Sequence, residues 1–311
     1  MKVEDIKKVA ILGTGLMARG IVQEFAQAGY DTYMIGRSVE SIEKAFFGIL
    51  DNLEYLKLKS LITELEYNSA VSKIYTTHIL NEIPSDVDLV IESVVEDLEI
   101  KRNLFEKVEA ICSNQTIFTS NTSSFTPTLL ANCLKNPGRF LNTHYFNPPQ
   151  LVPLVELIKG EKTEDMYVSL MYELYVKLGK KPVVLKKEIP GFIANRLQIA
   201  LLREALHIVE SGAADASDID TVIKNSIGRR WAAAGVFEVC DLGGLDVFTK
   251  IAAILQPELC SEIKISKLLE EKLTSGKIGV KNGQGFYDWT PEKIKLVKEK
   301  IFNEFSTQKL Q

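Results

Sequence analysis

The chain has 311 residues, which is long for a single core and predicts two domains. A formal net charge of −4 argues against a nucleic-acid-binding surface, which normally carries a basic excess. The four cysteines are far apart and form no C-x-x-C pair, so they predict neither a metal site nor a disulfide framework. Without a long apolar run or a signal core, we expect a cytoplasmic protein with no membrane partner.

The first part of the chain alternates short apolar runs with helical patterns. Strands are predicted at residues 9–12, 32–35, 86–91, 116–119, 139–143 and 181–185, and two helices within 41–72. From Pro190 onward helical patterns follow one another, at 192–211, 216–227 and 245–255, with a turn-rich segment at 277–289 and a final helix beyond Pro291. We therefore predict an α/β domain at residues 1–188 and an all-α domain at 189–311.

A glycine motif follows the first predicted strand. Gly13-Thr-Gly-Leu-Met-Ala18 leads from this strand into a helix, and a second strand comes next. The first glycine permits a tight turn, and the second lets the backbone approach a pyrophosphate at the helix N-terminus. This order predicts a Rossmann-type doubly wound sheet that binds a dinucleotide through Gly13, Gly15, Leu16 and Met17.

The end of the second predicted strand departs from the usual pattern. In NAD enzymes an acidic residue here binds the adenosine ribose, whereas this chain has Gly36, followed by Arg37 and Ser38. Losing the carboxylate removes its repulsion against a 2′-phosphate, and an arginine can bind that phosphate bidentately. The segment favours NADP, although a solvated turn arginine explains Arg37 as well.

Four further blocks resemble signature sequences of the 3-hydroxyacyl-CoA dehydrogenase family. They are Ser120-Asn-Thr-Ser-Ser124, His144-Tyr-Phe-Asn-Pro148 with Leu154-Val-Glu-Leu157, Pro190-Gly-Phe-Ile-Ala-Asn-Arg196, and Gly283-Gln-Gly-Phe-Tyr-Asp288. The resemblance extends from about Lys8 to Trp289 and implies a nicotinamide-dependent dehydrogenase. In this family the usual cofactor is NAD, so the resemblance implies a cofactor-binding role for the domain 1–188. It also implies that the helical domain 189–311 contributes to the substrate cleft and forms a homodimer.

The resemblance also implies the roles of individual residues. His144 is the general acid/base for the hydroxyl proton, a role that suits a group titrating near neutral pH. Glu156 orients its imidazole, and Ser123 and Asn195 bind the substrate oxygen. Ser123 and Asn195 could instead serve as helix caps.

Three residues complete the predicted cofactor site, in which we expect no metal. Glu96 matches a family position near the nicotinamide, with Lys101 as its possible partner. Asn121, in the first of the four blocks, is also a candidate cofactor-binding residue.

The substrate stays open between two classes of small molecule. A short-chain 3-hydroxyacyl-CoA is the family's substrate, but the stretch 44–59 is less basic than expected for a surface that binds CoA phosphates. The segment Arg229-Arg230-Trp231 resembles the corresponding segment of relatives that oxidise free hydroxy acids such as gulonate or carnitine. An arginine at this place could bind a free carboxylate. A catalytically silent structural protein, as among the lens crystallins of this family, is the third alternative.

Overall fold

The computed structural model describes residues 1–308, and the contacts divide it into two units. The first unit consists of Met1–Ile193 with the residues from Phe305 onward, and the second of Ala194–Glu304. The domain boundary predicted after residue 188 lies shortly before this division. The roles assigned to the two domains stay predictions.

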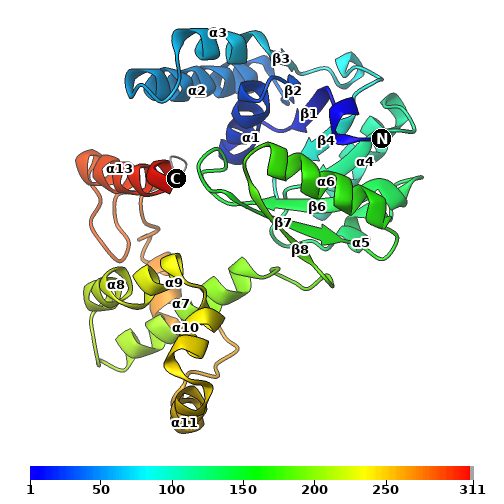
Figure 1. Cartoon of the computed structure of the whole chain (residues 1–311). Coiled ribbons are helices and arrows are strands. Elements are labelled where there is room, and N and C mark those ends of the chain that lie inside the picture. Colours follow the sequence, from blue (N-terminus) through cyan, green and yellow to red (C-terminus); the bar gives the residue numbers. More distant parts are fainter. Residues whose placement is uncertain (309–311) are drawn as a thin grey trace. The chain divides into compact units, whose positions relative to one another are not determined.

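An eight-stranded sheet forms the centre of the first unit (Figure 1). Its strands are β1 (Lys8–Leu12), β2 (Asp31–Ile35), β3 (Ile74–Thr77), β4 (Leu89–Glu92), β5 (Ile117–Ser120), β6 (Phe140–Tyr145), β7 (Leu154–Lys159) and β8 (Lys181–Leu185). The order is β3-β2-β1-β4-β5-β6-β7-β8, and all neighbours are parallel except β6 and β7. β4 and β5 are buried along their whole length, as parallel strands covered on both faces should be.

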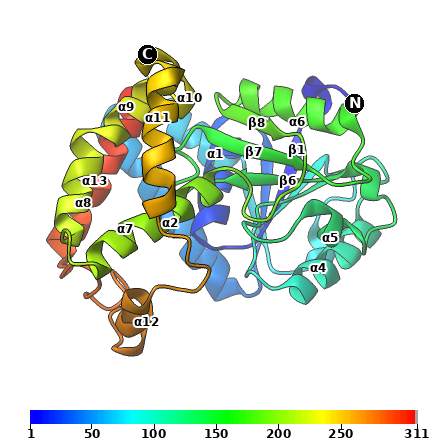
Figure 2. The same ribbon diagram turned by 90° about the horizontal axis from the view of Figure 1, so that it is seen from below.

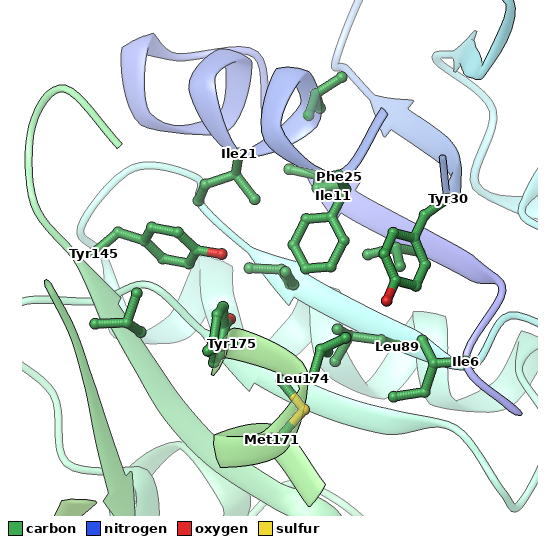
Figure 3. Packing of buried hydrophobic residues seen from close by; sticks show 14 of the residues in the cluster. Ile6, Ile11, Ile21, Phe25, Tyr30, Leu89, Tyr145, Met171, Leu174 and Tyr175 are labelled. Carbon is green, nitrogen blue, oxygen red and sulfur yellow. The ribbon is translucent and has the colours of Figure 1, made fainter. Parts of the chain in front are cut away.

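Helices cover both faces of the sheet, with α6 on one side and α4 and α5 on the other (Figure 2). The helices of this unit are α1 (Leu16–Gln27), α2 (Val39–Leu58), α3 (Glu64–Ser72), α4 (Leu98–Ile111), α5 (Pro127–Ala131) and α6 (Asp165–Lys177). One buried cluster joins α1, α2, α3 and α6 to the sheet, and Figure 3 shows its Phe25, Tyr145 and Tyr175. A second cluster joins α4 and α5 to the opposite face. The predicted doubly wound α/β fold is confirmed.

Helix caps place the helix starts close to strand ends. Gly15 is the N-cap of α1, shortly after β1. At the start of α2 the hydroxyl of Ser38 accepts a hydrogen bond from the backbone N–H of Ser41, and at the start of α4 Asp97 accepts one from Ile100. The chain segments between these strands and helices are therefore short and held in place at one edge of the sheet.

Two strands were not predicted. β3 lies at the edge of the sheet and exposes Tyr75 and Thr76, so it lacks the apolar run of a buried strand. β7 carries Glu156 between apolar residues and pairs with β6 in the antiparallel direction. The order of strands along the chain does not by itself indicate such a reversal within a parallel sheet.

The second unit is helical, as predicted. It contains α7 (Ala194–Glu210), α8 (Ala216–Asn225), α9 (Ile227–Ala233), α10 (Val236–Gly243), α11 (Leu245–Leu255), α12 (Lys267–Thr274) and most of α13 (Pro291–Gln308). Among the described residues of this unit Leu206 is the one buried apolar side chain, whereas Phe237, Leu242 and Ile254 are largely exposed. Within residues 1–308 no helix is both long and apolar enough to span a membrane.

Candidate active site

Three of the predicted catalytic residues form a chain of hydrogen bonds. The Nε2 atom of His144 lies 3.1 Å from the hydroxyl of Ser123, and its Nδ1 atom lies 2.8 Å from Oε2 of Glu156. His144 is at the end of β6 and Glu156 is its direct partner on β7. The antiparallel register of β6 and β7 therefore brings the two side chains together.

The surroundings of His144 decide which nitrogen carries the proton. An ionised carboxylate only accepts hydrogen bonds, so Glu156 holds the proton of the neutral ring on Nδ1. The lone pair of Nε2 then points towards Ser123, whose side chain is exposed, while His144 and Glu156 are buried. The imidazole is thus prepared to accept a proton on the side that solutes can reach.

The second oxygen of Glu156 binds a backbone group. Its Oε1 atom accepts a hydrogen bond of 2.9 Å from the N–H of Ile193. Gly191 and Phe192 both adopt positive φ values, 75° and 53°, and this turn brings that N–H to the carboxylate. A left-handed conformation is costly for an aromatic residue, and here it serves the site, because the ring of Phe192 also packs edge-on against His144 at 5.2 Å.

The glycine turn after β1 fits a dinucleotide. A Cβ atom on Gly13, which has a φ of 130°, would lie 2.3 Å from the carbonyl oxygen of Ser93, so only glycine fits this approach. At Gly15 a Cβ would meet nothing within 4 Å, which leaves open space in front of the N-terminus of α1. Leu16 is exposed in the first turn, whereas Met17 packs against the core. Backbone N–H groups at such a helix end suit a pyrophosphate.

The end of β2 has no room for a side chain at Gly36. A Cβ there would lie 2.5 Å from Cγ1 of Ile42 and 2.9 Å from Cγ2 of Thr14. Arg37 is exposed, and within residues 1–308 its side chain makes no hydrogen bond or ion pair. Ser38 caps α2. Arg37 is therefore the side chain of this segment that is available to a ligand.

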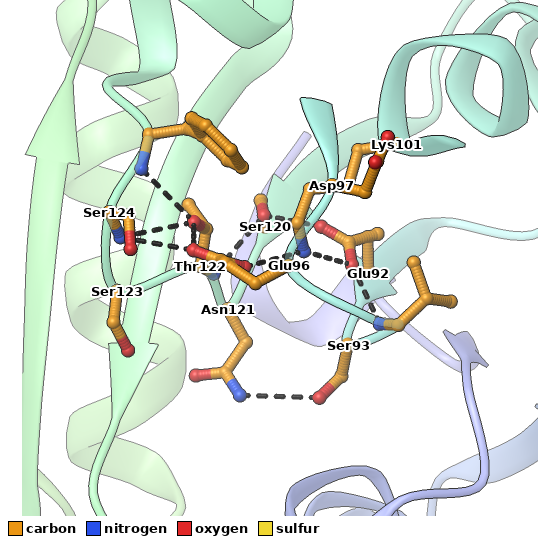
Figure 4. Close-up of polar contacts among 12 residues, drawn as sticks. Glu92, Ser93, Glu96, Asp97, Lys101, Ser120, Asn121, Thr122, Ser123 and Ser124 are labelled. Atoms are coloured by element: carbon orange, nitrogen blue, oxygen red, sulfur yellow. Dashed lines mark hydrogen bonds and ion pairs between the residues drawn. The ribbon is translucent and has the colours of Figure 1, made fainter. Parts of the chain in front are cut away.

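Glu96 and Lys101 belong to a polar network between β4, α4 and the turn after β5, in which Lys101 is buried and Glu96 is partly exposed (Figure 4). The ammonium of Lys101 lies 2.7 Å from Glu92 and 3.1 Å from Glu96. Glu96 accepts hydrogen bonds from the hydroxyl of Thr122 and the N–H of Ser124. Burial opposes the ionisation of Glu96, but the bond from Thr122 and the charge of Lys101 outweigh it and lower its pKa.

This network fixes the turn that carries Ser123. Glu96 holds the residues on both sides of Ser123, and Glu92 accepts a hydrogen bond of 2.5 Å from the hydroxyl of Ser120. Ser120 in turn accepts one from the N–H of Thr122. Ser123 is thereby held where it meets His144.

The two asparagines occupy different places. Asn121 donates to the hydroxyl of Ser93 at 3.3 Å and accepts a bond from the N–H of Tyr145, so it ties β4 and β6 together beside the glycine turn. Asn195 lies in the first turn of α7, in the second unit. Its role towards the substrate stays a prediction.

Sequence inspection missed several residues of this site. Glu92 was not predicted as a site residue, although its side chain is fully buried and accepts a hydrogen bond from Lys101. The nine-residue spacing of these two was the available signal. Phe192 and Ile193 lie in the third of the four blocks, but their contacts with His144 and Glu156 were not predicted, because they depend on how the chain folds back.

These features define a class. The mostly parallel sheet, the glycine turn at a helix N-terminus and the histidine–carboxylate pair on β6 and β7 are features of a dinucleotide-binding oxidoreductase. Two models of one family match the chain, "3-hydroxyacyl-CoA dehydrogenase, NAD binding domain" over residues 8–189 and its "C-terminal domain" over residues 191–289. The chain belongs to the 3-hydroxyacyl-CoA dehydrogenase family.

Among the similar proteins, one is named for a free carboxylic acid and others are named for CoA thioesters. A 5-formyl-3-hydroxy-2-methylpyridine 4-carboxylate 5-dehydrogenase of Mesorhizobium japonicum is 33% identical over 293 residues, 94% of each chain. A 3-hydroxybutyryl-CoA dehydrogenase of Bradyrhizobium diazoefficiens is 34% identical over 285 residues, 91% of this chain and 96% of the other. We refer to the first as the pyridine-carboxylate dehydrogenase.

Solved structures of both kinds resemble this fold. A crystal structure of a pyridine-carboxylate dehydrogenase, described as an NAD+ dependent dismutase, has a TM-score of 0.90 and 30% identity, covering 98% of this chain and 97% of the other. The (S)-3-hydroxybutyryl-CoA dehydrogenase PaaH1 of Ralstonia eutropha has a TM-score of 0.76 and 29% identity, covering 92% and 99%.

Proposed function

We propose that the protein interconverts a short-chain 3-hydroxyacyl-CoA and the corresponding 3-ketoacyl-CoA by hydride transfer with a nicotinamide cofactor. The observation that carries this proposal is the hydrogen-bonded chain Ser123–His144–Glu156 at the strand ends. A buried imidazole with a carboxylate behind it and a hydroxyl in front of it suits the transfer of a proton to and from a substrate oxygen.

In the direction of alcohol oxidation, Nε2 of His144 takes the proton of the substrate hydroxyl. A bound nicotinamide would supply the hydride acceptor for the same carbon. Glu156 stabilises the imidazolium that forms, through the bond to Nδ1. Ser123 donates a hydrogen bond to the substrate oxygen, and Asn195 is the proposed second donor. In the reduction His144 returns its proton to that oxygen.

The cofactor is held, in this proposal, by the glycine turn and the end of β2. The N-terminus of α1 at Gly15 receives the pyrophosphate, and Glu96, Lys101 and Asn121 lie at the nicotinamide end. Arg37, which is exposed beside the end of β2, favours the 2′-phosphate of NADP. The similar pyridine-carboxylate dehydrogenase is described as NAD+ dependent, so both cofactors enter the assay below.

We also propose that the helical unit forms a homodimer. Unit 2 leaves large apolar side chains on α10 and α11 exposed, among them Leu242 and Ile254, at 84% and 70%. Exposed apolar surface of this extent is typical of a subunit interface.

A free hydroxy acid is the second candidate substrate. The solved structure with the TM-score of 0.90 is that of a pyridine-carboxylate dehydrogenase. Lys57 on α2 is already paired with Glu54 and Glu64, at 2.8 and 3.1 Å, which weakens it as a partner for a CoA phosphate. Arg229 and Arg230 on α9 are exposed and suit a free carboxylate.

The deciding experiment is an absorbance assay of cofactor oxidation with acetoacetyl-CoA, run in parallel with NADH and NADPH. Turnover with either cofactor supports the thioester reaction, and the ratio of the two rates reports the cofactor preference. A protein that binds NADH or NADPH but does not turn over acetoacetyl-CoA contradicts the proposal. Turnover of a free oxo acid would then support the second candidate. Variants of Arg229 and Arg230 serve as controls, because they should lose that turnover if these arginines bind the free carboxylate.

A further inference from the structure

A buried ion pair lies outside the site described so far. Lys180, between α6 and β8, places its ammonium 2.6 Å from Oε1 of Glu24 on α1, and the two side chains are 3% and 9% exposed. Burying two charges costs free energy, and replacing both members of such a pair by apolar side chains is often neutral for stability. What an ammonium group adds, compared with an apolar side chain, is a set of hydrogen bonds to particular acceptors.

Those bonds reach the loop between β6 and β7. Besides Glu24, the ammonium of Lys180 binds the carbonyl oxygens of Pro149 and Val152, the latter at 3.0 Å. An ammonium group only donates hydrogen bonds, and each of these oxygens is an acceptor for it. The same group lies 5.4 Å from the ring centre of Tyr145, which Figure 3 shows beside Ile21 and Tyr175.

Other contacts hold the same loop against α1. A Cβ atom on Gly20 would lie 2.4 Å from both Cγ of Pro149 and Oε1 of Gln150, so the missing side chain lets the loop touch the helix. On the opposite side the N–H of Lys181 donates to the carbonyl of Pro153 at 2.8 Å. The loop is therefore fixed between α1 and the start of β8.

This loop connects two functional parts of the first unit. It closes the hairpin of β6 and β7, which carries His144 and Glu156 as direct partners. The helix it rests on, α1, begins at Gly15 of the glycine turn. A movement of the loop would change the position of the imidazole relative to the helix end that faces the cofactor.

We propose that Lys180, held by Glu24, is a positioning residue of the reaction. It fixes the loop between β6 and β7, residues 146–153, against α1 and so sets where His144 stands relative to the N-terminal end of that helix. The inference rests on the proposed function, because that function makes His144 the residue that transfers the proton.

The test compares Lys180→Met, Glu24→Gln and the double variant with the unaltered protein. We expect Lys180→Met to lower kcat about ten- to a hundredfold, since small displacements of a catalytic group have effects of that order. Glu24→Gln keeps the shape of the side chain and removes its charge, so it should lower kcat less than Lys180→Met does. The double variant should be no worse than Lys180→Met, because both changes break one unit. KM for acetoacetyl-CoA should change little.

Lys159→Met is the matched control. It removes an ion pair of similar length, 2.7 Å to Asp165, which is exposed and lies away from the loop. Thermal unfolding and the ¹⁵N chemical shifts of the His144 ring are recorded for every variant. A change of those shifts in Lys180→Met and Glu24→Gln, but not in Lys159→Met, is expected.

Unchanged kcat and ring shifts with a lower Tm would make Lys180 a structural residue and overturn the inference. If Lys180→Met does not fold, Glu24→Gln decides by the same criteria. If the unaltered protein does not turn over acetoacetyl-CoA, the proposed function fails, and the inference is judged by the ring shifts and by NADH affinity alone. Changes in both would support the positioning role, and no change would refute it.

Discussion

The Glu156 carboxylate receives two hydrogen bonds from different parts of the chain. One comes from the imidazole of His144 and the other from the N–H of Ile193, at 2.8 and 2.9 Å. A buried carboxylate without such donors would be costly, so both bonds compensate for the burial of Glu156. The orientation of the imidazole is therefore set before any substrate binds.

Replacing His144 by alanine tests the proposed acid/base role. Turnover should fall by at least ~10²-fold, because this is the low end for the loss of a general base. Binding of NADH, measured by its fluorescence, should be retained. His78→Ala, an exposed histidine after β3, serves as the control and should keep full turnover. Unchanged turnover of His144→Ala would reject the assignment.

Arg37→Asp tests the proposed cofactor preference. The carboxylate would repel a 2′-phosphate and accept bonds from ribose hydroxyls, so the ratio of kcat/KM for NADPH to that for NADH should fall about tenfold or more. The acid has to be placed at position 37, because a side chain at Gly36 would collide with Ile42 at 2.5 Å. A ratio that does not change would show that Arg37 is only a solvated turn residue.

At the scale of elements, an ion pair as well as apolar packing holds α4 against the sheet. Lys101 and Glu92 are 1% and 0% exposed and lie 2.7 Å apart. Removing one member of a buried pair leaves the other charge without compensation. This pair therefore links the stability of the first unit to the turn that carries Ser123.

Lys101→Met should lower the free energy of unfolding by about 3–5 kcal/mol, and Glu92→Gln in the same protein should recover part of that loss. Urea denaturation of the single and double variants measures both effects. Lys73→Met, which breaks a partly exposed pair with Asp31, is the control and should cost at most about 1 kcal/mol. Equal losses for Lys101→Met and Lys73→Met would contradict this account of α4.

The hairpin of β6 and β7 shows what the sequence spacing of two residues can and cannot predict about their structure. The twelve residues from His144 to Glu156 agree with the family motif, and the two proved to be direct cross-strand partners. The strand that carries Glu156 was nevertheless not predicted. Its reversed direction depends on pairing with β6 and β8, which the residues 154–159 do not encode by themselves.

For the whole molecule, the amount of exposed apolar surface differs between the two units. The first unit has two large buried clusters, whereas among the described residues of the second Leu206 alone is a buried apolar side chain. A helical unit of this kind gains stability from burying apolar surface against a partner. The proposed homodimer would supply that burial.

Ile254→Lys tests the proposed dimer. Ile254 is 70% exposed on α11, and a charge there should weaken association about tenfold or more if it lies in the interface. Sedimentation at several protein concentrations measures the dissociation constant. Leu65→Lys, 79% exposed on α3, is the control and should leave association unchanged. A monomeric unaltered protein would refute the dimer directly.

The sequence by itself determined the doubly wound α/β class with every strand except β3 and β7, the glycine turn and the family motifs, because apolar periodicity, glycines and spacings are local properties of the chain. It placed Ser123, His144 and Glu156 in one site. Only the tertiary structure decided the partners of those residues: the reversed β7, the Phe192 turn, the Glu92–Lys101 pair and the Lys180 bonds. These contacts join residues far apart in the chain, so they depend on the packing of whole elements.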